Sequence, residues 1–178
     1  MTFTETSIAG AFLLEPERIE DERGFLARTW SARELEARGL ETRIVQCSLS
    51  YNERRGTIRG LHYQAPPHEE VKIVRCTMGS LHDVIVDARP ASRTSGRWHA
   101  VQLTAKNRLA LYIPEGVAHG YQTLEDWTEV FYQISESYHP ESARGIRWND
   151  PAFGIAWPAP PTVISTRDAS FPLVGGCG

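Results

Sequence analysis

Apolar and polar residues alternate over short segments through most of the chain. Such segments cover residues 71–77, 80–87, 98–103, 108–113 and 129–135. Turn residues separate them, among them Met78-Gly79, Ser95-Gly96 and Pro114-Glu115-Gly116. An alternation with a period of two is typical of a half-buried strand, and many short strands at regular spacing indicate a sandwich or a barrel. The pattern therefore predicts a mainly β protein.

Helical signals are few. Ser31 and Glu34 form a capping-box pattern that leads into Leu35, and Gly39 closes the segment, which predicts one short surface helix. The proline-rich stretch 157–161 predicts a crossing over the surface to a last short segment around Asp168. At 178 residues, we expect a single domain over 1–178 with a loose C-terminal tail from about residue 173.

Composition and charge exclude several classes of protein. Hydrophobic residues make up 41% and charged residues 23%, with a net charge of -3, as in ordinary globular proteins. The Lys and Arg residues are scattered, so we expect no nucleic-acid partner. No apolar run approaches the ~18 to 20 residues of a membrane span, and no leader pattern opens the chain, so we expect a cytoplasmic protein without membrane contact. The three cysteines lack CxxC spacing, which argues against a disulfide framework or a zinc knuckle.

Alternation also indicates which polar side chains share a face with apolar ones. Tyr132 shares its face with Val130 and Ile134, and Lys72 shares its face with Val74. A buried ammonium loses its hydration at a cost of several kcal/mol, so an inward Lys72 requires an anionic partner or a bound anion. The alternative is a strand whose Lys72 face is solvated, because alternation alone does not distinguish inside from outside.

His62 lies in the segment Arg59-Gly60-Leu61-His62-Tyr63-Gln64. Histidine is the side chain whose ordinary pKa is near neutral pH, which makes His62 a candidate for proton transfer. The alternative is a hydrogen-bonded core histidine. A barrel that holds His62, Lys72, Tyr132 and His119 inside would enclose a polar cavity in an apolar core. Such cavities are usually binding or catalytic sites.

Strand-rich domains of this size include metal-binding cupins, so we tested the chain for their ligands. The metal form uses a His-x-His pair, but the second position after His62 is Gln64. The segment 114–119 is similar to the second cupin motif and ends in His119. One histidine from each half is a weak ligand set, so we expect His62 and His119 to be metal-free polar groups.

Taken together, the motifs resemble those of the dTDP-4-dehydrorhamnose 3,5-epimerase family of nucleotide-sugar enzymes. The matching segments follow in order over nearly the whole chain: 21–25, 59–64, 72–75, 83–87, 113–119 and 145–151. The resemblance implies a cupin-type double-stranded β-helix, or jelly roll, with a few short helices and without metal or cofactor. It also implies a homodimer in which N-terminal strands are exchanged between subunits.

The resemblance implies a chemistry that fits these residues. A C4 ketone makes the C3–H and C5–H bonds of a sugar weakly acidic, and epimerisation needs a base on one face of the ring and an acid on the other. His62 matches the family's base, Tyr132 its acid, and Asp168 the carboxylate that orients the histidine. Lys72 matches the cation near the forming enolate oxygen.

The family's binding residues also match positions of this chain. Arg23, Gln46, Arg59 and His119 match contacts to the diphosphate, nucleotide and sugar, and Tyr138 matches an aromatic platform for the base. Arginine suits a diphosphate because its planar fork donates paired hydrogen bonds. Arg23 is expected to reach across the dimer, which would make each site composite.

Three positions depart from the family pattern at the nucleotide end of the expected ligand. Arg28 and Ala143 each replace a glutamate, and Ser48 replaces an asparagine. Glutamate accepts a hydrogen bond from thymine N3–H, whereas arginine donates to cytosine N3, so Arg28 favours cytosine. The alternative is that Arg28 turns outward and another group holds the base.

We therefore expect an isomerase that epimerises a nucleotide-diphospho-4-keto-6-deoxyhexose at C3 and C5, for deoxysugar and polysaccharide biosynthesis. A C3-only epimerase and a CDP-linked substrate are the nearest alternatives. A ketoisomerase of the same fold and a nucleotide-sugar-binding jelly roll without activity are more distant. The acid and base argue against a pure binding protein, which needs neither.

Overall fold

The computed structural model describes residues 1–174, and strands dominate them. In order along the chain, the elements of these residues are β1 (Thr2–Glu5), β2 (Phe12–Glu15), β3 (Arg18–Asp21), β4 (Gly24–Ala27), α1 (Ala32–Glu36), β5 (Gln46–Asn52), β6 (Ile58–Gln64), β7 (Lys72–Met78), β8 (Ser80–Asp87), β9 (Trp98–Thr104), β10 (Ala110–Ile113), β11 (Val117–Thr123), β12 (Thr128–Ile134), β13 (Ala143–Gly145) and α2 (Thr166–Ala169). The five segments predicted from alternation are all strands, with ends that differ by at most two residues.

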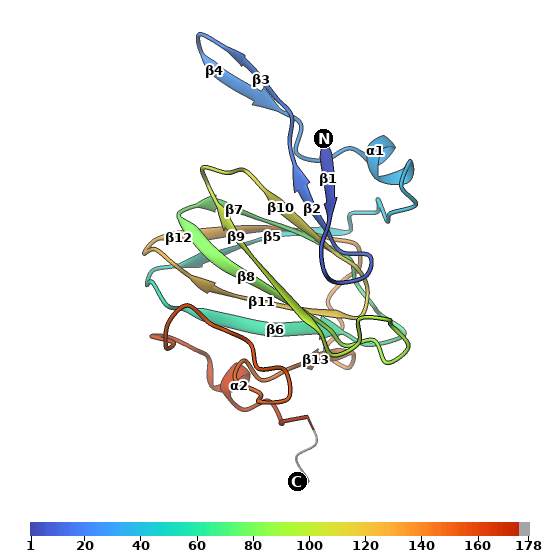
Figure 1. The fold of residues 1–178 in the computed structure, drawn as a ribbon, viewed down its shortest axis with the longest axis vertical. Coiled ribbons are helices and arrows are strands. Elements are labelled where there is room, and N and C mark those ends of the chain that lie inside the picture. Colours follow the sequence, from blue (N-terminus) through green and yellow to red (C-terminus); the bar gives the residue numbers. More distant parts are fainter. Residues whose placement is uncertain (175–178) are drawn as a thin grey trace.

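The strands form two antiparallel sheets that face each other (Figure 1). The first sheet has the order β1-β2-β10-β7-β12-β5, and the second has the order β13-β6-β11-β8-β9. From β5 to β8, and again from β9 to β12, consecutive strands change sheet. This double-sheet jelly roll confirms the predicted fold class, including the small share of helix.

The main apolar core lies between the two sheets. Val74 and Leu111 of the first sheet pack there with Leu81 and Ile85 of the second. A fully buried side chain of this kind contributes about 1.5–3 kcal/mol. Two further clusters cover the outer faces, one beneath α1 and one beneath the segment that follows β13. One end of the interior is left for polar side chains, and the candidate site lies there.

The predicted helix exists but lacks its capping box. Ser31 occupies the N-cap position without a side-chain hydrogen bond to the helix. The carboxylate of Glu34 instead lies 3.0 Å from the amino group of Met1, so it does not return to Ser31. Leu35 is fully buried, so the helix is held by packing and its inner face is part of the core.

Strands β3 and β4 form a hairpin that projects away from the two sheets (Figure 1). Ile19 and Leu26 are largely exposed on it. At the other end of the chain, the predicted loose tail from about residue 173 lies mostly outside the described residues. Within residues 1–174, neither helix has the length or apolar character required to cross a membrane.

Candidate active site

The centre of the candidate site is a hydrogen bond between His62 of β6 and Asp168 of α2. His62 Nε2 lies 2.7 Å from Asp168 Oδ1, and the Gly60 N–H donates to Asp168 Oδ2 at 3.0 Å. Burial opposes ionisation of Asp168, but these two hydrogen bonds outweigh it and hold the pKa of the carboxyl below its usual value. An ionised Asp168 keeps a proton on Nε2, which leaves the other ring nitrogen of His62 free to accept one.

Glycine at position 60 allows this contact. Its φ is +111°, and a Cβ there would lie 2.6 Å from the Cα of Gly120. Only glycine therefore lets β6 pass this close to β11 while its N–H points at Asp168.

The segment before α2 is fixed beside the start of β6. The Ile58 N–H donates to the Val163 carbonyl at 2.9 Å, and the Thr162 N–H donates to the Gly56 carbonyl at 2.9 Å. At the start of α2, the Ser165 side chain accepts from the Asp168 N–H, which is an ordinary N-cap. Asp168 is only 5% exposed. It is therefore a buried carboxylate of the site, although a residue in its position in the sequence could equally have been a surface carboxylate.

Tyr132 lines the same cavity as His62 and Asp168. This cavity of about 460 Å³ lies between β6, β12 and the segment that leads into α2. Burial, followed by the nearby Tyr121 and Asp83, raises the pKa of the Tyr132 hydroxyl well above its usual value. The hydroxyl therefore keeps its proton at neutral pH and is a potential proton donor.

His119 pairs with a carboxylate that the sequence reading did not assign. His119 of β11 lies opposite His62 of β6 in the sheet register, and its Nε2 is 2.9 Å from Asp83 Oδ2. The His119 and Tyr132 rings meet edge to face at 5.8 Å. Asp83 is fully buried and directly precedes the apolar residues 84–86 of β8. A carboxylate next to such an apolar run was the signal that could have identified it.

Lys72 points inward, as its shared face with Val74 allowed, and it is 8% exposed. Its Nζ lies 2.7 Å from Glu70 Oε1 and donates to the His62 carbonyl at 3.3 Å. The anionic partner that a buried ammonium requires is therefore Glu70, which the sequence reading did not identify.

Arg59 lies at the mouth of the cavity. Its Nε donates to Asn52 Oδ1 at 2.8 Å, which sets the direction of the guanidinium. A second cavity of about 460 Å³ adjoins the first and shares Thr57, Arg59 and Val163 with it. The two cavities make a continuous cleft with Arg59 near its middle.

The other predicted binding residues are less close to this centre. Gln46 and Ser48 lie on β5, where Ser48 is paired with Tyr132 in the register. Tyr138 is exposed after β12. Arg23 is 82% exposed, pairs with Asp21 on the projecting hairpin, and does not line the His62 cavity. Arg28 follows the same hairpin and is also exposed.

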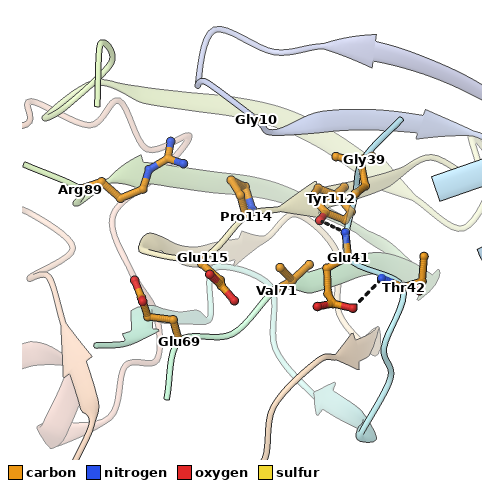
Figure 2. Close-up of a pocket in the computed structure, with 11 residues that line it drawn as sticks. Gly10, Gly39, Glu41, Thr42, Glu69, Val71, Arg89, Tyr112, Pro114 and Glu115 are labelled. Atoms are coloured by element: carbon orange, nitrogen blue, oxygen red, sulfur yellow. Dashed lines mark hydrogen bonds between the residues drawn. The ribbon is translucent and has the colours of Figure 1, made fainter. Parts of the chain in front are cut away.

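A third hollow, of about 700 Å³ and away from the cleft, lies between the loop before β5 and the end of β10 (Figure 2). The carboxylates of Glu41, Glu69 and Glu115 surround it. Its guanidinium, from Arg89, is engaged by Asp87 at 2.8 Å. This acidic lining would repel a diphosphate, so the hollow does not compete with the His62 cleft as a nucleotide-sugar site.

Neither His62 nor His119 belongs to a cluster of metal-ligand type in residues 1–174. The Nε2 atom of each ring is hydrogen-bonded to a carboxylate. The Gln64 side chain is hydrogen-bonded to the main chain of His68 and His139. The one such cluster found in these residues, outside the cleft, consists of His68, His139 and Glu141.

The sequence matches the dTDP-4-dehydrorhamnose 3,5-epimerase family over residues 5–175. A curated relative, the dTDP-4-dehydrorhamnose 3,5-epimerase of Sinorhizobium fredii, is 39% identical over 173 residues, which are 97% of this chain and 89% of that protein.

Solved structures of proteins with the same name are similar over their full length. The one from Elizabethkingia anophelis has a TM-score of 0.95 and 32% identity, and the match covers 98% of this chain and 97% of the other. The one from Bacillus anthracis, with TDP and PPi bound, has a TM-score of 0.93 and 38% identity, with coverage of 97% and 98%.

Proposed function

Because the chain belongs to the dTDP-4-dehydrorhamnose 3,5-epimerase family, we propose that it is the isomerase that inverts C3 and C5 of a dTDP-linked 4-keto-6-deoxyhexose in deoxysugar biosynthesis. The observation that carries the proposal is the cavity lined by both His62, bonded to Asp168, and Tyr132. Epimerisation needs a base and an acid around one ligand-sized space, and a pure binding protein does not.

Each inversion consists of two proton transfers. His62 removes the proton from the carbon beside the C4 ketone, and the electron pair moves onto the ketone oxygen as an enolate. Tyr132 then donates its proton to the same carbon from the opposite face, and the ketone reforms. His62 returns its proton to solvent and Tyr132 regains one from solvent, so each inversion leaves one solvent hydrogen on the carbon.

Lys72 is the cation that stabilises the enolate in this proposal. Its support is its burial and its hydrogen bond to the main-chain carbonyl of His62. A positive charge in a site with little water stabilises a developing oxyanion more than it would in water. Glu70 keeps this charge compensated when no substrate is bound.

The nucleotide end of the substrate lies in the outer cavity beyond Arg59. The guanidinium of Arg59 binds the diphosphate, and His119 contacts the sugar at the inner end. Gln46 and Ser48 contact the nucleotide from β5, and Tyr138 stacks on the base. The names of the relatives and the TDP bound in the Bacillus anthracis structure support thymine, whereas nothing in the comparisons supports cytosine.

Arg23 and Arg28 take part through dimer formation. Both lie on or beside the β3–β4 hairpin, which projects from the body with Ile19 and Leu26 exposed (Figure 1). A hairpin with exposed apolar side chains gains by packing on a partner. We propose that the hairpin exchanges between the subunits of a homodimer and brings Arg23, with Arg28 nearby, to the partner's cleft.

A heavy-water experiment tests the proposal. The protein is incubated in D₂O with dTDP-linked and, separately, CDP-linked 4-keto-6-deoxyglucose, and deuterium at C3 and C5 is counted by NMR. We expect deuterium at both carbons with the dTDP sugar. Deuterium at C3 alone would indicate a C3 epimerase. Incorporation only with the CDP sugar would show that the nucleobase of the substrate is cytosine instead of thymine. No incorporation with either sugar would refute the enzymatic proposal.

A further inference from the structure

Two histidines and a glutamate meet outside the catalytic cleft, on the loops that follow β6 and β12. The rings of His68 and His139 are parallel, with centroids 3.5 Å apart and an interplanar angle of 3°. Glu141 Oε1 lies 3.1 Å from His139 Nδ1 and 3.8 Å from His68 Nε2. One ligand atom from each of the three residues lies within 4.8 Å of the others.

These separations suit one metal ion once the two stacked rings turn apart, because an imidazole binds a metal in the plane of its ring and parallel rings have no such point in common. Nitrogen and oxygen ligands at ~2.0–2.2 Å from a tetrahedral zinc ion lie about 3.3–3.5 Å from each other. The two measured separations fall on either side of this value, and the side chains of His68 and His139 are about one-third exposed, which leaves them room to adjust. Two imidazoles with one carboxylate are typical ligands of Zn²⁺, Co²⁺ and Ni²⁺, and water completes the coordination.

The backbone that carries the histidines is already fixed by a buried side chain. Gln64 is 2% exposed, and its Nε2 donates to the His68 carbonyl at 2.9 Å and to the Ser137 carbonyl at 3.0 Å. Its Oε1 accepts from the His139 N–H at 2.6 Å. Metal binding therefore requires little ordering of the main chain, which lowers its entropic cost.

The carboxylate of the cluster is also suited to ligation. An exposed glutamate carboxyl is ionised at neutral pH, as a metal ligand must be. Glu141 is 66% exposed, so an ion can approach directly from solvent.

We propose that His68, His139 and Glu141 bind one divalent transition metal ion of the zinc, cobalt and nickel class, at a site separate from the cleft of His62 and Tyr132. The bound ion links the loop after β6 to the loop after β12. These loops extend the strands that carry the proposed base and acid, so the ion stabilises the end of the jelly roll beside the cleft.

Titration of the tag-free, chelator-treated protein with Co²⁺ tests the site, because imidazole-bound Co²⁺ absorbs visible light and reports its coordination directly. Zn²⁺ is then titrated by calorimetry. We expect one saturable equivalent of each ion and a higher melting temperature with Zn²⁺. His68→Gln and His139→Gln should each weaken binding at least tenfold, and the double variant should abolish it.

Three further variants make the test specific. Glu141→Gln changes an exposed side chain, so it tests the ligand set without endangering the fold, and we expect weaker binding. His99→Gln removes an imidazole that bonds Ser7 far along the chain from the cluster, and we expect unchanged binding. His62→Gln should also bind normally. No saturable binding, equal binding by His139→Gln and the unaltered protein, or binding that is lost only in His62→Gln would each overturn the proposal.

Discussion

At the scale of single residues, each ionisable side chain of the candidate site lies against an opposite or hydrogen-bonding partner. His62 pairs with Asp168, His119 pairs with Asp83, and Lys72 pairs with Glu70. A buried charge without such a partner costs several kcal/mol, so these pairs are what allow ionisable groups to exist inside a jelly roll. Asp168 and Asp83 come from other segments of the chain, and Glu70 lies just before β7, outside the alternating strand. Alternation within one strand therefore indicated which side chains share a face but not their partners.

Replacement of the proposed base or acid should stop the reaction and leave the fold intact. His62→Gln and Tyr132→Phe are each expected to lower the rate of inversion by ~10²- to 10⁴-fold, because each removes one proton transfer. The rate at which the inverted sugar forms is measured by NMR, and circular dichroism and the melting temperature check the fold. Inversion at the normal rate by both variants would remove His62 and Tyr132 from the mechanism.

Asp87 should make stability depend on acid pH. Burial alone would raise its pKa, but hydrogen bonds from Arg89, Ser92 and Thr94 outweigh burial and hold the pKa well below its usual value. The unfolded value is about 3.9, so this stabilisation is complete above about pH 5 and is lost as the pH falls through 4 toward the folded pKa.

The variant that tests this pH dependence is Asp87→Asn, whose side-chain amide carries no negative charge to accept the hydrogen bonds. We expect it to lower the free energy of unfolding by about 2–3 kcal/mol at pH 7 and by much less at pH 3, measured by urea unfolding. Glu20→Gln, which changes the charge on the exposed hairpin equally, is the control and should have little effect at either pH. A loss for Asp87→Asn that does not vary with pH would contradict this account.

At the scale of elements, the site depends on how closely the C-terminal segment packs on β6 and β13. Gly145 of β13 is paired with His62 in the register, and the Phe171 ring lies directly over it. The same ring meets the His62 ring edge to face at 5.9 Å. The Arg147 side chain donates to the Phe171 carbonyl at 2.6 Å, so the segment is held from both sides.

Gly145→Ala should therefore impair catalysis through packing. An added Cβ would lie 2.1 Å from Phe171, so the ring and the α2 segment with Asp168 must shift. We expect turnover to fall about tenfold and stability to fall by about 1–3 kcal/mol, as for other overpacked sites. The double variant Gly145→Ala/Phe171→Leu makes space for the methyl group and should recover part of the turnover and part of the stability. Normal turnover by Gly145→Ala alone would rule out the packing argument.

At the scale of the whole molecule, one chain holds the proposed acid, the proposed base and Arg59 around one cavity. It carries Arg23 on the β3–β4 hairpin, which points away from the two sheets (Figure 1). Exchange of this hairpin in a symmetric dimer would give each cleft residues from two chains. The exposed Ile19 and Leu26 would then be covered by the partner.

Composite sites predict that two inactive variants restore each other. His62→Gln and Arg23→Ala are unfolded together and refolded as a mixture, and epimerase activity is compared with that of each variant alone. Random assortment makes half of the dimers mixed, each with one intact site, so recovery should reach about a quarter of the normal activity.

The control mixture is His62→Gln with Tyr132→Phe. Both residues line the same cavity of one chain, so mixed dimers contain no intact site and no recovery is expected. Recovery in neither mixture, with Arg23→Ala inactive alone, would place Arg23 in its own chain's site or outside it. Light scattering of the unaltered protein tests the dimer directly.

The sequence predicted the elements better than their ends or contacts. The alternating segments are strands because only a strand places residues two apart on the same face, and here one face must be buried. The predicted capping box is wrong because the Glu34 carboxylate pairs with the Met1 amino group, which lies outside the local sequence pattern. The strands β5 and β11 and the partner Asp83 were not assigned, because pairing between distant strands leaves little trace in either strand alone.

The sequence by itself determined the fold class, the family and the faces that Lys72 and Tyr132 share with apolar neighbours, since motifs and alternation are local patterns along the chain. That these faces point inward was decided by the tertiary structure. Only the tertiary structure decided that Asp168 meets His62, that Arg23 lies outside its own chain's cleft, and that His68 meets His139. These contacts join residues far apart in the chain. Their geometry depends on strand register and on close backbone approaches such as that at Gly60, which no single segment specifies.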